Sequence, residues 1–138
     1  DWGFVGDIDT VNEKMLALLL ENGIMPVISP ITCSPAGQLL NTNADSVASA
    51  VAIALSRRYE TELVYCFDKP GVLKDAEDNS SVIPQMDRET YDVLRKEGYI
   101  HSGMLPKLEN AFKTLESGVK KVRLTSPENP DGGTVIGF

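Results

Sequence analysis

The chain has 138 residues, 42% of them hydrophobic and 24% charged, which is the balance of one globular domain. Its net charge of −7 is spread without basic clusters, and no segment approaches the ~18 apolar residues of a membrane span, so neither nucleic acid nor membrane is expected as a partner. Two cysteines and one histidine are too few for a zinc centre, so we expect no metal ligands and a reducing, cytoplasmic location.

A helix is predicted first, and short strands follow it. VNEKMLALLLEN at 11–22 places apolar side chains at helical spacing, with Asp9 or Thr10 as N-cap and Gly23 as the C-terminal stop. The apolar run IMPVISPI at 24–31 is too short for a helix and predicts a strand. The next expected elements are a turn at 34–37, a short strand at 38–42 and a small-residue helix at 44–57.

The remaining sequence alternates apolar strands with helices. ELVYCF at 62–67 is a continuous apolar run, typical of a parallel strand covered on both faces. Pro106 fixes a helix start near Met104 or Leu105, because proline is tolerated only in the first turn. The other expected elements are a loop at 68–80, helices at 86–99 (capped by Asp87) and 103–118, and strands at 120–125 and 133–138. The alternation predicts an α/β fold with a mainly parallel sheet sandwiched by helices.

Polar residues gather where strands end and helices begin, which is where open α/β sheets bind ligands. Asp45 and Lys107 both lie near helix starts, so both are placed to project into one crevice, with the lysine facing a phosphate and the aspartate holding the lysine. Considered one at a time, each residue has a plainer interpretation: Asp45 as a helix cap and Lys107 as a solvated residue of the first turn. A first-turn lysine opposes the helix dipole, however, unless an anion also lies there.

The other polar candidates have two readings each. Asn41 and Asn43 of NTNAD could bind a ligand carboxylate, or they could be ordinary turn residues. Gly6 could let the backbone approach a ligand closely, or it could be part of an ordinary loop. DKPG at 68–71 could contact a nucleotide, or it could be a plain turn. His101 could contact a phosphate, or it could be an exposed loop residue. Neither a P-loop nor a dinucleotide-binding motif is present. These residues alone therefore indicate an α/β domain with a phosphorylated ligand as a candidate.

Five sequence blocks in one order carry more information than any block alone. They are GFVGDIDTVN, MPVISPI, LLNTNADSVASAVAIAL, VYCFDKPGVL and GMLPKLENAFKTLESGV. Together they resemble the carboxyl-terminal half of the N-acetylglutamate kinases, within the amino acid kinase family. The resemblance covers nearly the whole chain and implies a carbamate kinase-like fold. Residues 1–138 would then form a single nucleotide-binding lobe of a longer kinase whose amino-terminal half is absent.

The resemblance also implies a reaction. The γ-phosphoryl group of ATP would pass to the side-chain carboxylate of an N-acylglutamate, with acetyl or succinyl as the acyl group, to give an acyl phosphate in arginine biosynthesis. A carboxylate nucleophile needs no general base, so positioning and charge stabilisation would be the protein's main contribution. Mg²⁺ would be bound mainly through the nucleotide phosphates. A homo-oligomer is implied for the full-length protein.

Residue roles follow from the resemblance motif by motif. Lys107 would neutralise charge on the transferring phosphoryl group, and Asp45 would position the catalytic lysines. Asn41, Asn43 and Gly6 would bind the acyl amino acid. The residues expected near the nucleotide are Asp68, Gly71, His101, Ser102 and Gly103.

Departures from the family pattern lead to further expectations. The family carries a glycine-rich lysine loop, a Gly-Gly loop and a substrate-binding arginine in its amino-terminal half, and because this sequence has none of them we expect the chain to be inactive alone. Phe67 stands where family members often carry serine or threonine, which puts one nucleotide hydrogen bond in question. Two alternatives stay open: another kinase of the family, such as an aspartate or glutamate kinase, and a non-catalytic nucleotide-binding module.

Overall fold

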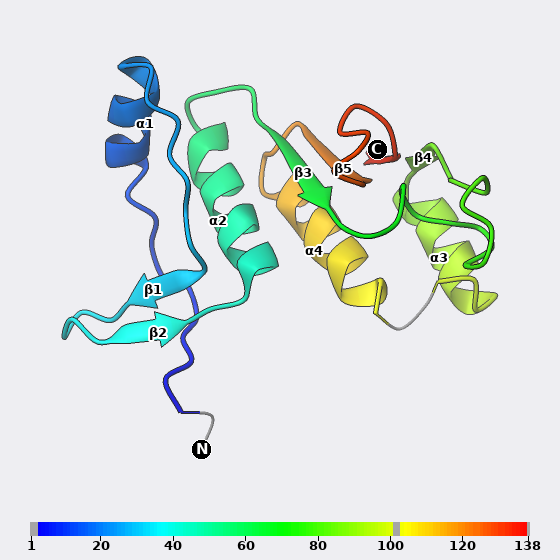
Figure 1. Ribbon diagram of the computed structural model, residues 1–138, viewed down its shortest axis with the longest axis horizontal. Helices are drawn as coiled ribbons and strands as arrows, with labels where there is room; N and C mark the ends of the chain where they lie inside the picture. Colours follow the sequence, from blue (N-terminus) through cyan, green and yellow to red (C-terminus); the bar gives the residue numbers. More distant parts are fainter. Residues whose placement is uncertain (1–2, 101–102, 138) are drawn as a thin grey trace.

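The computed structural model describes residues 3–100 and 103–137, and its elements form two neighbouring parts (Figure 1). The first part contains helix α1 (Glu13–Glu21), the antiparallel hairpin of β1 (Ile31–Cys33) and β2 (Leu39–Asn41), and helix α2 (Ala44–Ser56). The second contains β3 (Glu62–Cys66), β4 (Gln85–Met86), α3 (Arg88–Lys96), α4 (Leu105–Glu116), β5 (Lys121–Thr125) and β6 (Thr134–Ile136). Helices α2 and α4 lie side by side and join the two parts.

The larger sheet has the strand order β3-β5-β6-β4. β3 runs parallel to β5 and β4 parallel to β6, while β5 and β6 are antiparallel. A mainly parallel sheet with helices packed on it confirms the predicted α/β class. The two-residue strand β4 was not predicted, since it is too short to show a pattern of its own.

The core lies where α4 packs on this sheet. Phe112 and Tyr91 are fully buried, and their ring centroids lie 5.3 Å apart, within the range of favourable aromatic pairs. Residues three and four positions apart along α4 supply the rest of the buried helix face, which is the spacing of an apolar stripe. Its members are Leu108, Ala111, Phe112 and Leu115, and they meet Leu63, Met86, Val122, Leu124 and Ile136 of the strands.

Strand β3 is covered on one face only. Leu63 and Tyr65 are buried, whereas Val64 and Cys66 alternate with them and are exposed. The expectation that both faces of this strand are covered is wrong for this chain. Helices α2 and α4 cover one face, and nothing in the described part of the chain buries the other to the same extent.

Helix α1 confirms the predicted amphipathic helix, but its cap differs from the expected one. The Asn12 side chain accepts a hydrogen bond from the Met15 amide at 3.1 Å, so Asn12 is the N-cap in place of Asp9 or Thr10. Gly23, at φ +73°, ends the helix as predicted, because glycine enters the left-handed region without strain.

The apolar segment 24–31 differs most from prediction. Strand β1 takes in only Ile31 from this segment, and residues 24–30 pair with no strand in the described part of the chain. They run extended beside α2 (Figure 1), with Met25 85% and Val27 96% exposed. A strand needs a partner to satisfy its backbone, and residues 3–100 and 103–137 supply none here. The predicted strand is therefore wrong over 24–30.

Helices α3 and α4 start where the sequence indicated. Asp87 caps α3 by accepting a hydrogen bond from the Thr90 amide at 2.7 Å, as predicted. Helix α4 begins at Leu105 with Pro106 in its first turn, which confirms that prediction too. Within the described ranges, none of the helices has both the length and the apolar character needed to cross a bilayer.

Candidate functional site

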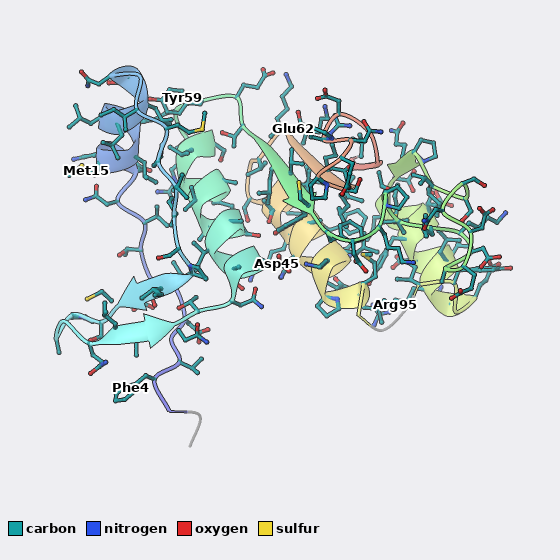
Figure 2. All side chains as sticks on the ribbon, viewed as in Figure 1. Phe4, Met15, Asp45, Tyr59, Glu62 and Arg95 are labelled. Atoms are coloured by element: carbon teal, nitrogen blue, oxygen red, sulfur yellow. The ribbon has the colours of Figure 1, made fainter. Side chains whose placement is uncertain are left out.

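An ion pair joins the starts of α2 and α4. The Lys107 ammonium nitrogen Nζ lies 2.6 Å from the Asp45 carboxylate oxygen Oδ2, and the two side chains are 28% and 29% exposed. Asp45 lies in the first turn of α2 and Lys107 in the first turn of α4, and both helices start on the same side of the molecule (Figure 2). The structure thus brings together the two residues that the sequence placed in one crevice.

The local caps explain why both side chains are available for this pair. Asn43 caps α2 by accepting a hydrogen bond from the Ser46 amide at 3.1 Å, so the reading of Asp45 as the helix cap is wrong. Helix α4 has no side-chain cap at its start, which leaves amide donors there beside the Lys107 ammonium. Two helix N-termini and one cation therefore meet a single carboxylate, an arrangement that favours an additional anion.

Tyr65 lies beneath the pair and was missed by the sequence analysis. It projects from β3, is 4% exposed, and its hydroxyl hydrogen-bonds to the Ser49 hydroxyl and donates to the Asp45 carbonyl oxygen at 3.3 Å. The Lys107 Nζ lies 5.8 Å from the centre of its ring. Burial raises the pKa of the Tyr65 phenol, so the hydroxyl keeps its proton at neutral pH. The available signal was a tyrosine hydroxyl inside the otherwise apolar run LVYCF.

The loop with Gly6 and the strand with Asn41 are hydrogen-bonded neighbours. The Gly6 amide donates to the Asn41 carbonyl oxygen at 3.0 Å, and the Asn41 amide donates to the Phe4 carbonyl oxygen at 2.8 Å. A Cβ on Gly6 would lie 2.6 Å from Leu40 Cδ1, so this close approach requires glycine. The structure brings these two candidates together and gives Gly6 a packing role of its own.

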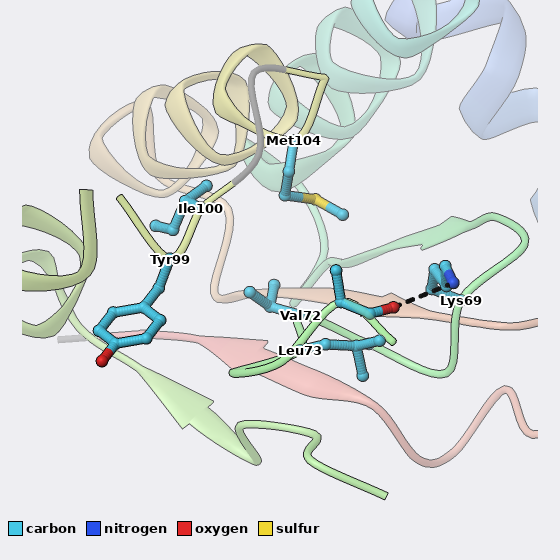
Figure 3. Close-up of a pocket in the computed structure, with 8 residues that line it drawn as sticks. Lys69, Val72, Leu73, Tyr99, Ile100 and Met104 are labelled. Atoms are coloured by element: carbon cyan, nitrogen blue, oxygen red, sulfur yellow. Dashed lines mark hydrogen bonds between the residues drawn. The ribbon is translucent and has the colours of Figure 1, made fainter. Parts of the chain in front are cut away.

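A second feature is a mostly apolar slot between the loop after β3 and the chain before α4. Figure 3 shows Ile100 and Met104 on one side of it, opposite Val72 and Leu73. The Lys69 ammonium lies at its edge and donates to the Ala76 carbonyl oxygen at 3.4 Å. The lining residues are Lys69, Gly71, Val72, Leu73, Ala76, Tyr99, Ile100 and Met104.

The residues predicted to lie near the nucleotide differ in how they relate to this slot. Gly71 lines it, and a Cβ there would lie 2.9 Å from Thr134 Oγ1, so glycine also serves packing. Asp68 precedes the slot in sequence, and Gly103 is next to Met104, which lines it. His101 and Ser102 lie outside the described residues.

The slot and the ion pair are connected through α4. Met104 lines the slot, and Lys107 follows it by three residues, about one helical turn. A flat apolar ligand group in the slot would therefore direct an attached anionic group toward the start of α4. Over the described residues there is no cluster of three or more potential metal ligands.

Known proteins resemble this chain over most of its length. The model of the amino acid kinase family matches residues 1–126. The chain is 47% identical to the acetylglutamate kinase of Parabacteroides distasonis over 125 residues, which are 91% of this chain and 49% of that protein. It thus spans about half the length of the curated relatives it matches.

Solved structures confirm the fold. A Streptococcus mutans protein superposes with a TM-score of 0.80 at 32% identity, over 97% of this chain and 51% of that one. Carbamate kinase from Giardia lamblia bound to AMP-PNP has a TM-score of 0.69 at 16% identity, over 94% of this chain and 50% of that one. The predicted carbamate kinase-like fold is confirmed by these similarities. Since the family model matches all but the last twelve or so of its residues, the chain belongs to the amino acid kinase family.

Proposed function

We propose that this chain is the nucleotide-binding half of an acetylglutamate kinase. The complete polypeptide would transfer the γ-phosphoryl group of ATP to the side-chain carboxylate of an N-acylglutamate and form an acyl phosphate in arginine biosynthesis. The observation that carries the proposal is the 2.6 Å contact between Lys107 and Asp45 at two adjoining helix starts. The name of the Parabacteroides distasonis relative, acetylglutamate kinase, supports the choice of acceptor.

Lys107 stabilises the phosphoryl group during transfer. Negative charge spreads over the three equatorial oxygens of that group, and a fixed ammonium with nearby helix amides lowers its energy. Asp45 holds the ammonium in place without touching the substrate. Asn41 and Asn43 bind the acyl amino acid, and the backbone around Gly6 lines its site. The carboxylate attacks directly, so no side chain of this chain needs to remove a proton.

The nucleotide binds with its base in the apolar slot and its phosphates toward α4. Asp68 and Gly103 flank this path. His101 and Ser102 lie outside the described residues, and the family resemblance alone makes them nucleotide contacts. Mg²⁺ would be held mainly through the phosphate oxygens of the nucleotide and water, as this hard cation commonly is in phosphoryl-transfer enzymes. When bound, Mg²⁺ neutralises the phosphates. Phe67 packs against the core and offers the nucleotide no hydroxyl.

The segment 24–31 is the seam to which the other half of the polypeptide docks. Its aliphatic side chains are exposed, and two apolar hollows lie beside it, one under α1 and one against α2. The chain spans about half of its relatives' length, so a companion segment of similar size is the occupant we propose. Pairing would satisfy the backbone of 24–30 and bury its side chains together.

Val27→Glu tests this seam. Burial of an unpaired carboxylate is costly, so we expect recovery of the complex between this chain and a separately expressed companion half to fall at least about tenfold. The measurement is co-purification followed by size-exclusion chromatography. Val93→Glu is the matched control, because Val93 is an exposed valine on α3, 46% accessible. Equal recovery of both variants would place the companion half elsewhere.

An acceptor panel tests the function itself. The complete polypeptide with Mg·ATP receives N-acetylglutamate, N-succinylglutamate, glutamate or aspartate, and hydroxylamine traps any acyl phosphate. We expect product from N-acylated glutamate only, and none from this chain alone. Product from aspartate or free glutamate instead would favour another kinase of the family. ATP binding with no acyl phosphate from any acceptor would favour a non-catalytic nucleotide-binding module.

A further inference from the structure

We propose that Tyr65 is a positioning residue that fixes Asp45, and through it Lys107, in the geometry of phosphoryl transfer. The inference rests on the proposed function and adds to it a residue that does not touch the substrate. Tyr65 is 4% exposed and lies on β3, directly below the starts of α2 and α4. It contacts both members of the ion pair, through the Asp45 carbonyl oxygen and the Lys107 ammonium.

The Tyr65 hydroxyl holds the first turn of α2 at two points. It hydrogen-bonds to the Ser49 hydroxyl, and it donates to the Asp45 carbonyl oxygen at 3.3 Å. These residues are four apart, so one phenol spans the turn that carries the Asp45 side chain. The first turn of a helix is otherwise prone to fray, because its amides lack intrahelical partners. A bond from a buried strand prevents that motion.

The Tyr65 ring supports the other partner of the pair. The Lys107 Nζ lies 5.8 Å from the ring centre, within the range over which an ammonium is attracted to an aromatic face. One side chain therefore links the strand to both helices whose starts carry the pair.

Tyr65→Phe is the test, because it removes the hydroxyl and keeps the ring. On the complete polypeptide we expect kcat to fall about five- to tenfold, the effect of one hydrogen bond, with the KM values for ATP and N-acetylglutamate within about twofold of wild type. The Ser49 amide, which bonds the Asp45 carbonyl in the helix, should also exchange its hydrogen several times faster.

Tyr91→Phe is the matched control. Tyr91 is also buried, and its hydroxyl donates at 2.7 Å to Glu109, which is not a member of the ion pair. The two variants should lose similar stability, but only Tyr65→Phe should lower kcat and speed exchange at Ser49. Ser49→Ala, which removes the second hydroxyl, is the milder variant if Tyr65→Phe folds poorly, and we expect it to lower kcat in the same direction.

The outcomes separate this inference from the proposed function. Unchanged kcat and unchanged exchange at Ser49 in Tyr65→Phe, in an active enzyme, would overturn the positioning role and leave the kinase assignment intact. A wild-type polypeptide that forms no acyl phosphate would overturn the function, while faster exchange at Ser49 would still establish that Tyr65 holds this turn. Equal losses of kcat in Tyr65→Phe and Tyr91→Phe would reduce Tyr65 to a general structural role.

Discussion

Lys107→Ala is expected to lower kcat of the complete polypeptide by about 10²–10³-fold, the usual cost of removing a group that stabilises transition-state charge. The ammonium lies 2.6 Å from Asp45 at the uncapped start of α4, so no other described cation replaces it there. The measurement is steady-state kinetics with Mg·ATP and N-acetylglutamate. Lys107→Arg should recover part of the loss, because the charge returns with a different shape.

Lys113→Ala is the control for this variant, since Lys113 lies near the end of the same helix. We expect its kcat to stay within about twofold of wild type, as for an exposed lysine with no part in the site. Asp45→Asn should lower kcat strongly in the wild-type background. In the Lys107→Ala background it should change kcat very little, because the two residues act as a unit. Full activity of Lys107→Ala would exclude the proposed role.

Phe112→Ala is expected to cost about 3–5 kcal/mol in free energy of unfolding, the range for deleting a buried aromatic ring. Phe112 is fully buried beside Tyr91, and the Arg88 guanidinium carbon lies 4.5 Å from its ring centre. The ring therefore connects α3, α4 and the sheet, and its removal leaves a cavity that these elements fill only in part. Urea unfolding followed by circular dichroism measures the loss.

Val93→Ala on the exposed side of α3 is the control, and its free energy of unfolding should stay within about 0.5 kcal/mol of wild type. A loss of less than 1 kcal/mol for Phe112→Ala would mean that α4 does not pack on the sheet as described. The urea dependence of the free energy should also keep its slope, since the surface exposed on unfolding hardly changes.

The helices and strand β3 could be predicted because their signals lie within each segment. The apolar stripe of α4, the first-turn Pro106 and the Asp87 cap are each visible in a few neighbouring residues. The segment 24–30 could not be predicted in the same way. Its residues favour a strand, but strand formation depends on a partner strand, which the described residues do not provide.

The site shows the same division between local and distant information. Asp45 and Lys107 could be placed at helix starts facing one crevice from the sequence, but their contact depends on how α2 packs on α4. Tyr65 could not be found locally, because a tyrosine in an apolar strand has the same pattern whether its hydroxyl is idle or holds a helix turn. Only the three-dimensional contact reveals that difference.

The prolines of the segment 24–30 make its two backbone edges unequal. In an extended chain successive amides point to opposite sides, so Pro26 and Pro30 remove donors from one side only. The Thr42 amide donates to the Pro30 carbonyl oxygen at 3.0 Å, so the edge depleted by proline faces β2. The amides of Val27 and Ser29 point outward on the intact edge. Only three residues lie between Pro26 and Pro30, fewer than the six or seven consecutive residues without proline that a steric zipper requires. This edge therefore accepts a strand but resists stacking into fibrils.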